Sequence, residues 1–107
     1  MPVAPVLVLI TYRALPGREV AAKEELRSLI ATVVASEPDC SGITMLEDAA
    51  DATRILLYEG WTSRDAYLGP HMQTPHLRAF IERAGTFMAG PPEITFWRTI
   101  AEEPAEV

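Results

Sequence analysis

The side chains that could do chemistry are concentrated between residues 55 and 80, ILLYEGWTSRDAYLGPHMQTPHLRAF. This stretch supplies a carboxylate, an indole, a phenol and both imidazoles of the chain: Glu59, Trp61, Tyr67, His71 and His76. An imidazole titrates near neutral pH, so either histidine could act as a general base. A phenol and an indole could orient a bound ring and stabilise negative charge. We therefore predict acid–base chemistry in this stretch.

Glu59 is expected to lie on an apolar face. Side chains alternate along a strand, so residues 55, 57, 59 and 61 share one face, which reads Ile, Leu, Glu, Trp. A buried carboxylate needs a donor, because an unpaired buried charge costs several kcal/mol. The candidates are the Trp61 indole and the His71 imidazole, and we expect a Glu59–His71 contact. A purely structural role for Glu59 and Trp61 is the alternative interpretation.

The two histidines have alternative interpretations as well. His76 is predicted in the first turn of a helix and could be a surface residue. The five-residue spacing of His71 and His76 matches no zinc motif, and no third ligand is evident, so we predict no metal site.

Length and composition limit the number of domains and the classes of partner that the chain could bind. A chain of 107 residues is expected to form one domain, residues 1–107, with a flexible tail at 100–107. A net charge of −6 argues against nucleic-acid and anionic-membrane partners, which require clustered Lys and Arg. The N-terminal apolar run is too short to span a bilayer and lacks the basic residues of a signal peptide, so we interpret it as a strand. A single cysteine cannot form an internal disulfide, which makes a cytoplasmic location the default.

Periodicity and turn residues predict the elements that position these side chains. The prediction is strand 6–13, helix 18–36, strand 42–47, loop 48–53, strand 54–61, short helix 64–68, a helix from residue 75 and strand 93–100. Thr62 and Thr74 are the predicted N-caps of the two later helices. The last helix is expected to bury Leu77, Phe80, Ile81 and Ala84. This order predicts an α+β fold of the ferredoxin-like split βαβ type, with an antiparallel sheet and helices on one face.

The first predicted strand, VLVLITYR, is apolar on both faces. Helices cover only one face of such a sheet, so the other face would expose a larger apolar patch than monomers usually tolerate. We therefore predict a homodimer formed through the open sheet faces.

The segment YEGWTSRDAYLGPHMQTPHLRAF resembles the antibiotic biosynthesis monooxygenase (ABM) domain family. The shared pattern is aromatic-Glu-x-Trp, a short helix, a histidine, and a small residue-Pro-His-Leu/Phe sequence that opens the second helix. The resemblance covers nearly the whole chain and implies a homodimeric ferredoxin-like α+β barrel with a cavity between helices and sheet. Its members include cofactor-free oxygenases of phenols and quinols, haem-degrading enzymes, isomerases and proteins without known activity.

Individual residues separate these classes. The haem-degrading members bind iron through a histidine near the position of Ile81 and use an asparagine where this chain has Thr11 and Tyr12, so haem degradation is disfavoured. In the aromatic oxygenases, Trp61 and Tyr67 match a tryptophan and a tyrosine of the best-described type. Leu57 replaces its asparagine, and Arg78 and Arg83 lie near the position of its arginine.

The resemblance therefore implies a cofactor-independent monooxygenase that oxidises a small phenol, quinol or anthrone-like substrate with O2. His71, Tyr67 and Trp61 are the predicted catalytic residues. The predicted substrate-binding residues are Glu59, His76, Tyr12, Leu57, Met72 and Phe80, and no cofactor is expected. The alternatives are a noncatalytic dimer that binds a small molecule or serves in stress, and an isomerase of a small metabolite, which would need a more polar cavity.

Overall fold

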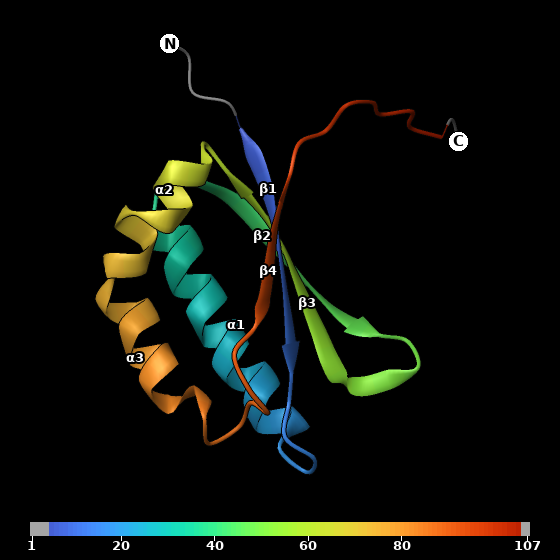
Figure 1. The fold of residues 1–107 in the computed structure, drawn as a ribbon, viewed down its shortest axis with the longest axis vertical. Helices are drawn as coiled ribbons and strands as arrows, with labels where there is room; N and C mark the ends of the chain where they lie inside the picture. The colour runs from blue at the N-terminus through green and yellow to red at the C-terminus, as the bar shows by residue number, and fades with distance from the viewer. Residues whose placement is uncertain (1–4, 106–107) are drawn as a thin grey trace.

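The computed structural model describes residues 5–105 and contains four strands, three α-helices and one 3-10 helix (Figure 1). In chain order these are β1 (Val6–Arg13), α1 (Glu19–Ser36), β2 (Cys40–Asp48), β3 (Asp51–Trp61), α2 (Arg64–Leu68), η1 (Pro70–Gln73), α3 (Pro75–Ala84) and β4 (Glu93–Trp97). The strands form one antiparallel sheet in the order β2-β3-β1-β4. All helices lie on the same side of this sheet (Figure 1). The predicted split βαβ fold is confirmed.

The core lies between the helices and one face of the sheet. Alternate residues of β1 point into it, and Val8 and Ile10 are almost completely buried. The register places Val8 opposite Glu59 and Ile10 opposite Leu57, so the carboxylate of β3 faces the core as predicted. From the helices, α1 contributes Ala22, Leu26 and Val33 and α3 contributes Leu77 and Phe80.

The hairpin between β2 and β3 is tighter than predicted. A loop over residues 48–53 was expected, but only residues 49 and 50 separate the two strands. Asp48 accepts a hydrogen bond from the Ala50 N–H at 2.8 Å, and Asp51 accepts bonds from the N–H and the hydroxyl of Thr53 at 3.0 and 2.6 Å. The polar composition of residues 48–53 predicted a loop. Because these local bonds satisfy the polar groups, Asp48 instead belongs to β2 and residues 51–53 belong to β3.

The helix ends also differ from the prediction. Ser63, not Thr62, caps α2, because its hydroxyl accepts the Ala66 N–H at 3.0 Å. Thr74 does occupy the cap position of α3, but its hydroxyl donates to the His71 carbonyl at 2.8 Å and makes no cap bond. Ile81 is 58% exposed rather than buried, since α3 turns Leu77 and Phe80 towards the sheet.

Strand β4 ends at Trp97, three residues before the predicted end, and the chain then runs away from the body of the molecule (Figure 1). Ile100 is 98% exposed. Residues 1–4 and 106–107, which belong to the predicted N-terminal run and C-terminal tail, lie outside the described part of the chain. Within the described residues, no helix is long and apolar enough to cross a bilayer.

The face of the sheet opposite the helices is apolar. Leu7 pairs with Trp97, Leu9 with Tyr58, and Leu46 with Leu56, so these side chains share that face. Trp97, Leu46 and Tyr58 are 54%, 46% and 44% exposed. Such a patch exceeds the scattered apolar residues normally found on a monomer surface.

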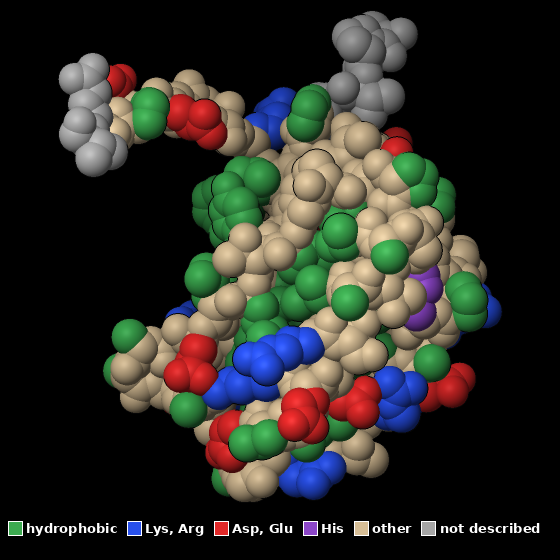
Figure 2. All heavy atoms as spheres, turned by 180° about the vertical axis from the view of Figure 1, so that it is seen from behind, with side chains coloured by type: hydrophobic (Ala, Val, Ile, Leu, Met, Phe, Trp, Pro, Cys, Tyr) green, Lys and Arg blue, Asp and Glu red, His purple; other side chains and the backbone are tan. Residues whose placement is uncertain are grey.

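Charged side chains on this face lie near the strand ends, where the register places Arg13 opposite Arg54 and Glu93 opposite Thr11. On the side of the molecule seen in Figure 2, hydrophobic side chains gather in the centre, and acidic and basic side chains are interspersed along the lower edge. Histidine is visible at the surface towards the right. On this side the basic side chains form no continuous positive surface of the kind that binds nucleic acid.

Candidate functional site

The candidate site is an apolar pocket of about 530 Å³, a volume typical of small-molecule sites. Its walls come from α2, η1, α3, the segment that joins α3 to β4, and the sheet. The residues around it are Tyr12, Tyr67, Met72, Leu77, Phe80, Ile81, Ala84, Gly85, Met88, Gly90, Pro91, Pro92 and Ile94. The joining segment is held against the end of β1 by backbone bonds from Leu15 N to Phe87 O at 2.9 Å and from Ala89 N to Arg13 O at 2.8 Å.

Two phenols supply the polar groups of this lining. The hydroxyls of Tyr12 and Tyr67 form no hydrogen bond with any described residue, and no completely buried side-chain N or O of the described residues lacks a partner. Both hydroxyls must therefore reach space accessible to water, and both tyrosines line the pocket. Burial raises the pKa of Tyr12 and of Tyr67 above its ordinary value, and the Glu59 charge adds to this effect. Both phenols thus remain protonated hydrogen-bond donors.

Aromatic packing fixes the two phenol rings. Tyr12 meets Phe80 edge-on with centroids 6.0 Å apart, and Tyr67 meets Phe96 in the same way at 5.7 Å. Edge-to-face pairs of this kind are favourable beyond the area that they bury. The donors are therefore held in place before a ligand binds.

A small void lies behind the tyrosines, with a volume of about 20 Å³, enough for about one water molecule. Tyr12, Tyr67 and Leu77 line both the void and the pocket. The other residues around the void include Leu57, Glu59 and His71. The two tyrosines thus lie between the apolar pocket and the void. The void, in turn, is bordered by two buried titratable side chains, Glu59 and His71.

Glu59 is paired with Trp61 and not with His71. The Trp61 indole donates to the Glu59 carboxylate at 2.9 Å, because residues two apart on a strand share a face. The expected Glu59–His71 hydrogen bond is absent among the described contacts, and that prediction was wrong. Glu59 is 4% exposed, and burial raises its pKa to about 7, with the nearby Glu37 charge acting in the same direction. The Glu59 carboxyl can therefore gain or lose a proton near neutral pH.

His71 pairs instead with Glu37, at the C-terminal end of α1. Its Nδ1 lies 2.9 and 3.0 Å from the two carboxylate oxygens of Glu37. His76 Nε2 lies 2.6 Å from the second of these oxygens. Burial lowers the pKa of His71 below its ordinary value, although the bond to Glu37 opposes this shift. The His71 imidazole is therefore neutral at pH 7.

The predicted site residues lie in four places. Tyr12, Tyr67, Met72 and Phe80 line the pocket, whereas Leu57, Glu59 and His71 line the void behind it. Trp61 lies beside the rings of Tyr67 and His71, at centroid distances of 5.5 and 4.6 Å, but its N–H is occupied by Glu59. His76 lines a separate groove between α1 and α3.

Sequence reasoning missed Glu37. No local spacing marks it, because it lies 34 residues before His71. The only available signal was topological: in a split βαβ fold the end of the first helix can approach the segment that follows the third strand. Among residues 5–105, no three His, Cys, Asp or Glu side chains are grouped as a metal site would require.

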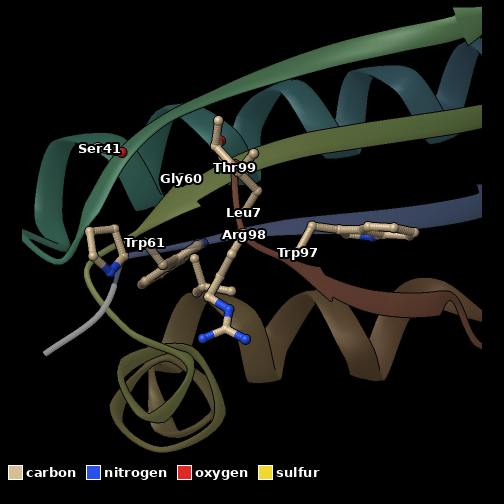
Figure 3. A pocket seen from close by; sticks show the side chains of 9 residues that line it. Leu7, Ser41, Gly60, Trp61, Trp97, Arg98 and Thr99 are labelled. Carbon is tan, nitrogen blue, oxygen red and sulfur yellow. The ribbon is translucent and has the colours of Figure 1, made fainter. Parts of the chain in front are cut away.

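A second hollow of about 420 Å³ lies at the end of the sheet, where Leu7, Gly60, Trp97 and Arg98 surround it beside Trp61 (Figure 3). Neither histidine, Glu59 nor Tyr67 lines it. Its lining includes Leu7 and Trp97, which belong to the open sheet face. We therefore place the candidate site in the tyrosine-lined pocket.

Comparisons with known proteins agree with this architecture. Residues 5–83 match the family model described as antibiotic biosynthesis monooxygenase. An uncharacterized protein of Synechocystis sp. is 33% identical over 101 residues, which cover 92% of this chain and 65% of that protein. The chain thus spans slightly less than two thirds of the length of that relative.

Solved structures show the same fold. A Pseudomonas aeruginosa protein superposes with a TM-score of 0.82 at 26% identity, covering 94% of this chain and 99% of that one. A Mycobacterium tuberculosis protein gives 0.80 at 24% identity, with 94% and 100% covered. A Caulobacter crescentus protein, described provisionally as an antibiotic biosynthesis monooxygenase, gives 0.82 at 24% identity, with 92% of each chain covered. The chain belongs to the antibiotic biosynthesis monooxygenase family, as its sequence motif predicted.

Proposed function

We propose that this protein is a cofactor-independent monooxygenase that oxidises a small phenol, quinol or anthrone-like molecule with O2. The observation that carries the proposal is the pocket itself. An apolar space of about 530 Å³ presents two protonated phenols, with a neutral imidazole behind them across a void that can hold one water. Such a site fits a flat apolar ring with an oxygen that can accept hydrogen bonds.

The chemistry requires a base and stabilisation of an anion. His71, acting through one water in the void, takes a proton from the substrate, and the hydroxyls of Tyr12 and Tyr67 stabilise the resulting anion. The electron-rich anion transfers an electron to O2, and the two radicals combine to form a peroxide. With an anthrone-like substrate, a ring CH2 becomes C=O, one oxygen atom enters the product and the other leaves as water. The substrate supplies all four electrons, so the reaction balances without another reductant.

The lining favours this reaction over an isomerase. Apart from the two tyrosines, the side chains around the pocket are aliphatic, aromatic or proline, and none is charged. A small polar metabolite would lose its hydration there without gaining matching hydrogen bonds. A noncatalytic binding protein with the same ligand class remains the second candidate, because the same pocket would serve it.

Oxygen consumption tests the proposal. A panel of quinols and anthrones is offered to the natural protein and to Tyr67→Phe, and uptake is followed with an oxygen electrode. The natural protein should consume O2 with at least one of these compounds. Tyr67→Phe should reduce the rate about 10- to 100-fold, as expected for the loss of one hydrogen bond to a charged group. Tyr58→Phe removes a phenol hydroxyl from the open face of the sheet and serves as the matched control.

The outcomes separate the two candidates. Ligand-induced quenching of tryptophan fluorescence without oxygen uptake would support the binding protein. Uptake that is equal in Tyr67→Phe and the natural protein would contradict the role of the pocket phenols.

We also propose that the open sheet face joins two copies of the chain. The face carries exposed Leu46, Tyr58 and Trp97, and a second copy offers the same apolar surface. The natural protein should sediment as a dimer at micromolar concentration, and Tyr58→Glu should sediment as a monomer, because it buries an unpaired charge in the interface. Leu68→Glu is the control: Leu68 is similarly exposed, at 46%, but lies on α2. A natural protein that sediments as a folded monomer would contradict the interface.

A further inference from the structure

The carboxylate of Glu37 joins the two histidines of the chain. His71 Nδ1 lies within 3.0 Å of both oxygens, and His76 Nε2 lies 2.6 Å from one of them. The side chains of His71, Glu37 and His76 are 5%, 11% and 20% exposed. His71 and His76 lie in η1 and α3, and Glu37 directly follows α1, so the fold brings the carboxylate to imidazoles that are 34 and 39 residues away in the chain.

The backbone explains why Glu37 reaches this position. Glu37 is the C-cap of α1, and its N–H still bonds to the Val33 carbonyl at 2.8 Å. Its extended conformation, with φ −111° and ψ 100°, is the one that a following proline imposes, and Pro38 follows. The helix end therefore directs the carboxylate away from the helix axis and towards the histidines.

Hydrogen-bond chemistry fixes the protons. An ionised carboxylate can only accept, so His71 Nδ1 and His76 Nε2 must both donate to Glu37. A neutral imidazole has one N–H, so His71 Nε2 carries a lone pair. This nitrogen has no hydrogen-bond partner among the described residues, and no completely buried side-chain nitrogen there lacks one. His71 Nε2 therefore touches accessible space, and His71 lines the void that it shares with Tyr67 and Glu59.

We propose that Glu37 is a positioning residue: by accepting a hydrogen bond from the Nδ1–H of His71, it holds that imidazole in the tautomer whose unprotonated Nε2 can take a proton from the void. His76 donates to the same carboxylate and limits its rotation. The proposal deepens the proposed function by assigning the orientation of its base. The tautomer itself does not depend on whether the protein consumes oxygen.

Nitrogen NMR of protein labelled with ¹⁵N-histidine tests the tautomer without a substrate. In the natural protein at pH 8, His71 Nδ1 should give the chemical shift of a protonated nitrogen and Nε2 that of an unprotonated one. Glu37→Ala should produce a substantial fraction of the opposite tautomer, and Glu24→Gln, an exposed change on the same helix, should leave the spectrum unchanged. A natural protein with Nε2 protonated and Nδ1 unprotonated would overturn the proposal even if Glu37→Ala does not fold.

Oxygen uptake supplies the second readout. Glu37→Ala should lower the rate by about 10²-fold or more, because a base in the wrong tautomer cannot accept the proton, and Glu37→Asp should restore part of it. The acid limb of the pH–rate profile should also move to lower pH in Glu37→Ala, since Glu37 raises the pKa of His71. The other titratable groups near His71 are His76, Glu59 and Tyr67, and they are unchanged in this variant.

The NMR and oxygen-uptake experiments distinguish failure of the Glu37 proposal from failure of the proposed function. If no compound in the panel is oxidised, the proposed function fails and the NMR experiment still decides the role of Glu37. If uptake occurs but Glu37→Ala retains the natural tautomer and the natural acid limb, Glu37 is only structural.

Discussion

Replacing Glu59 with glutamine is expected to raise the free energy of unfolding by about 3 kcal/mol at pH 8.5 and to change it little at pH 4. The cause is the cost of ionising a buried carboxyl. The pKa of Glu59 rises from 4.5 in the unfolded chain to about 7 in the fold, which at about 1.4 kcal/mol per tenfold change in affinity corresponds to about 3 kcal/mol. Glutamine keeps an oxygen that can accept the Trp61 N–H but never carries the charge.

The direction with pH follows from proton binding. Between about pH 4.5 and 7 the folded state binds more protons at Glu59 than the unfolded state, so the contribution of this group to stability falls as pH rises. It is most favourable below pH 4.5 and reaches its lowest value above pH 7. In Glu59→Gln the free energy of unfolding does not include this pH-dependent loss, because glutamine does not ionise. Other carboxylates, such as Asp51 with its pKa lowered to about 2, act in the opposite direction but equally in both proteins.

Urea unfolding at pH 4, 5.5, 7 and 8.5 measures the difference between the two proteins. Glu24→Gln, which removes an exposed carboxylate from α1, is the control and should show no difference that grows with pH. If the curves for the natural protein and Glu59→Gln run parallel over this range, the Glu59 carboxyl is not held in a protonated state by burial.

Replacing His71 with alanine should lower oxygen uptake by about 10²- to 10⁴-fold, the range that a positioned general base contributes. His71→Gln keeps most of the side-chain volume, so a similar loss there would exclude a simple packing defect. His76→Gln is the matched histidine variant and should cost much less, because His76 lies in the groove between α1 and α3 rather than at the void.

The pH dependence gives an independent check on His71. Burial lowers its pKa below 6.5, so the imidazole stays neutral, and able to accept a proton, at lower pH than an ordinary histidine. The uptake rate should therefore fall only as pH drops below 6.5 and through the lowered pKa of His71. Equal losses in His71→Gln and His76→Gln, or an acid limb above pH 6.5, would contradict the assignment of His71 as the base.

The elements that could be predicted from the sequence depend on local features. The alternation of Val8 and Ile10, the 3.6-residue period of α1 and the Thr-Pro start of α3 each depend on neighbours in the chain, and each of these elements was predicted. The errors arose where a tertiary or turn contact outweighed local preference. The Asp48 and Asp51 side chains extended the hairpin, and Ser63 replaced Thr62 as a cap.

The sequence by itself determined the order of the elements, the open apolar face of the sheet, and the placement of Glu59 on an apolar face, because alternation and helical period are properties of short segments. Only the tertiary structure decided which groups meet: that Trp61 satisfies Glu59, that Tyr12 and Tyr67 reach the same pocket, and that Glu37 holds His71. The reason is physical. A hydrogen bond between side chains 34 residues apart depends on how two helical segments pack on the sheet, to within tenths of an ångström, and no spacing in the chain records that distance.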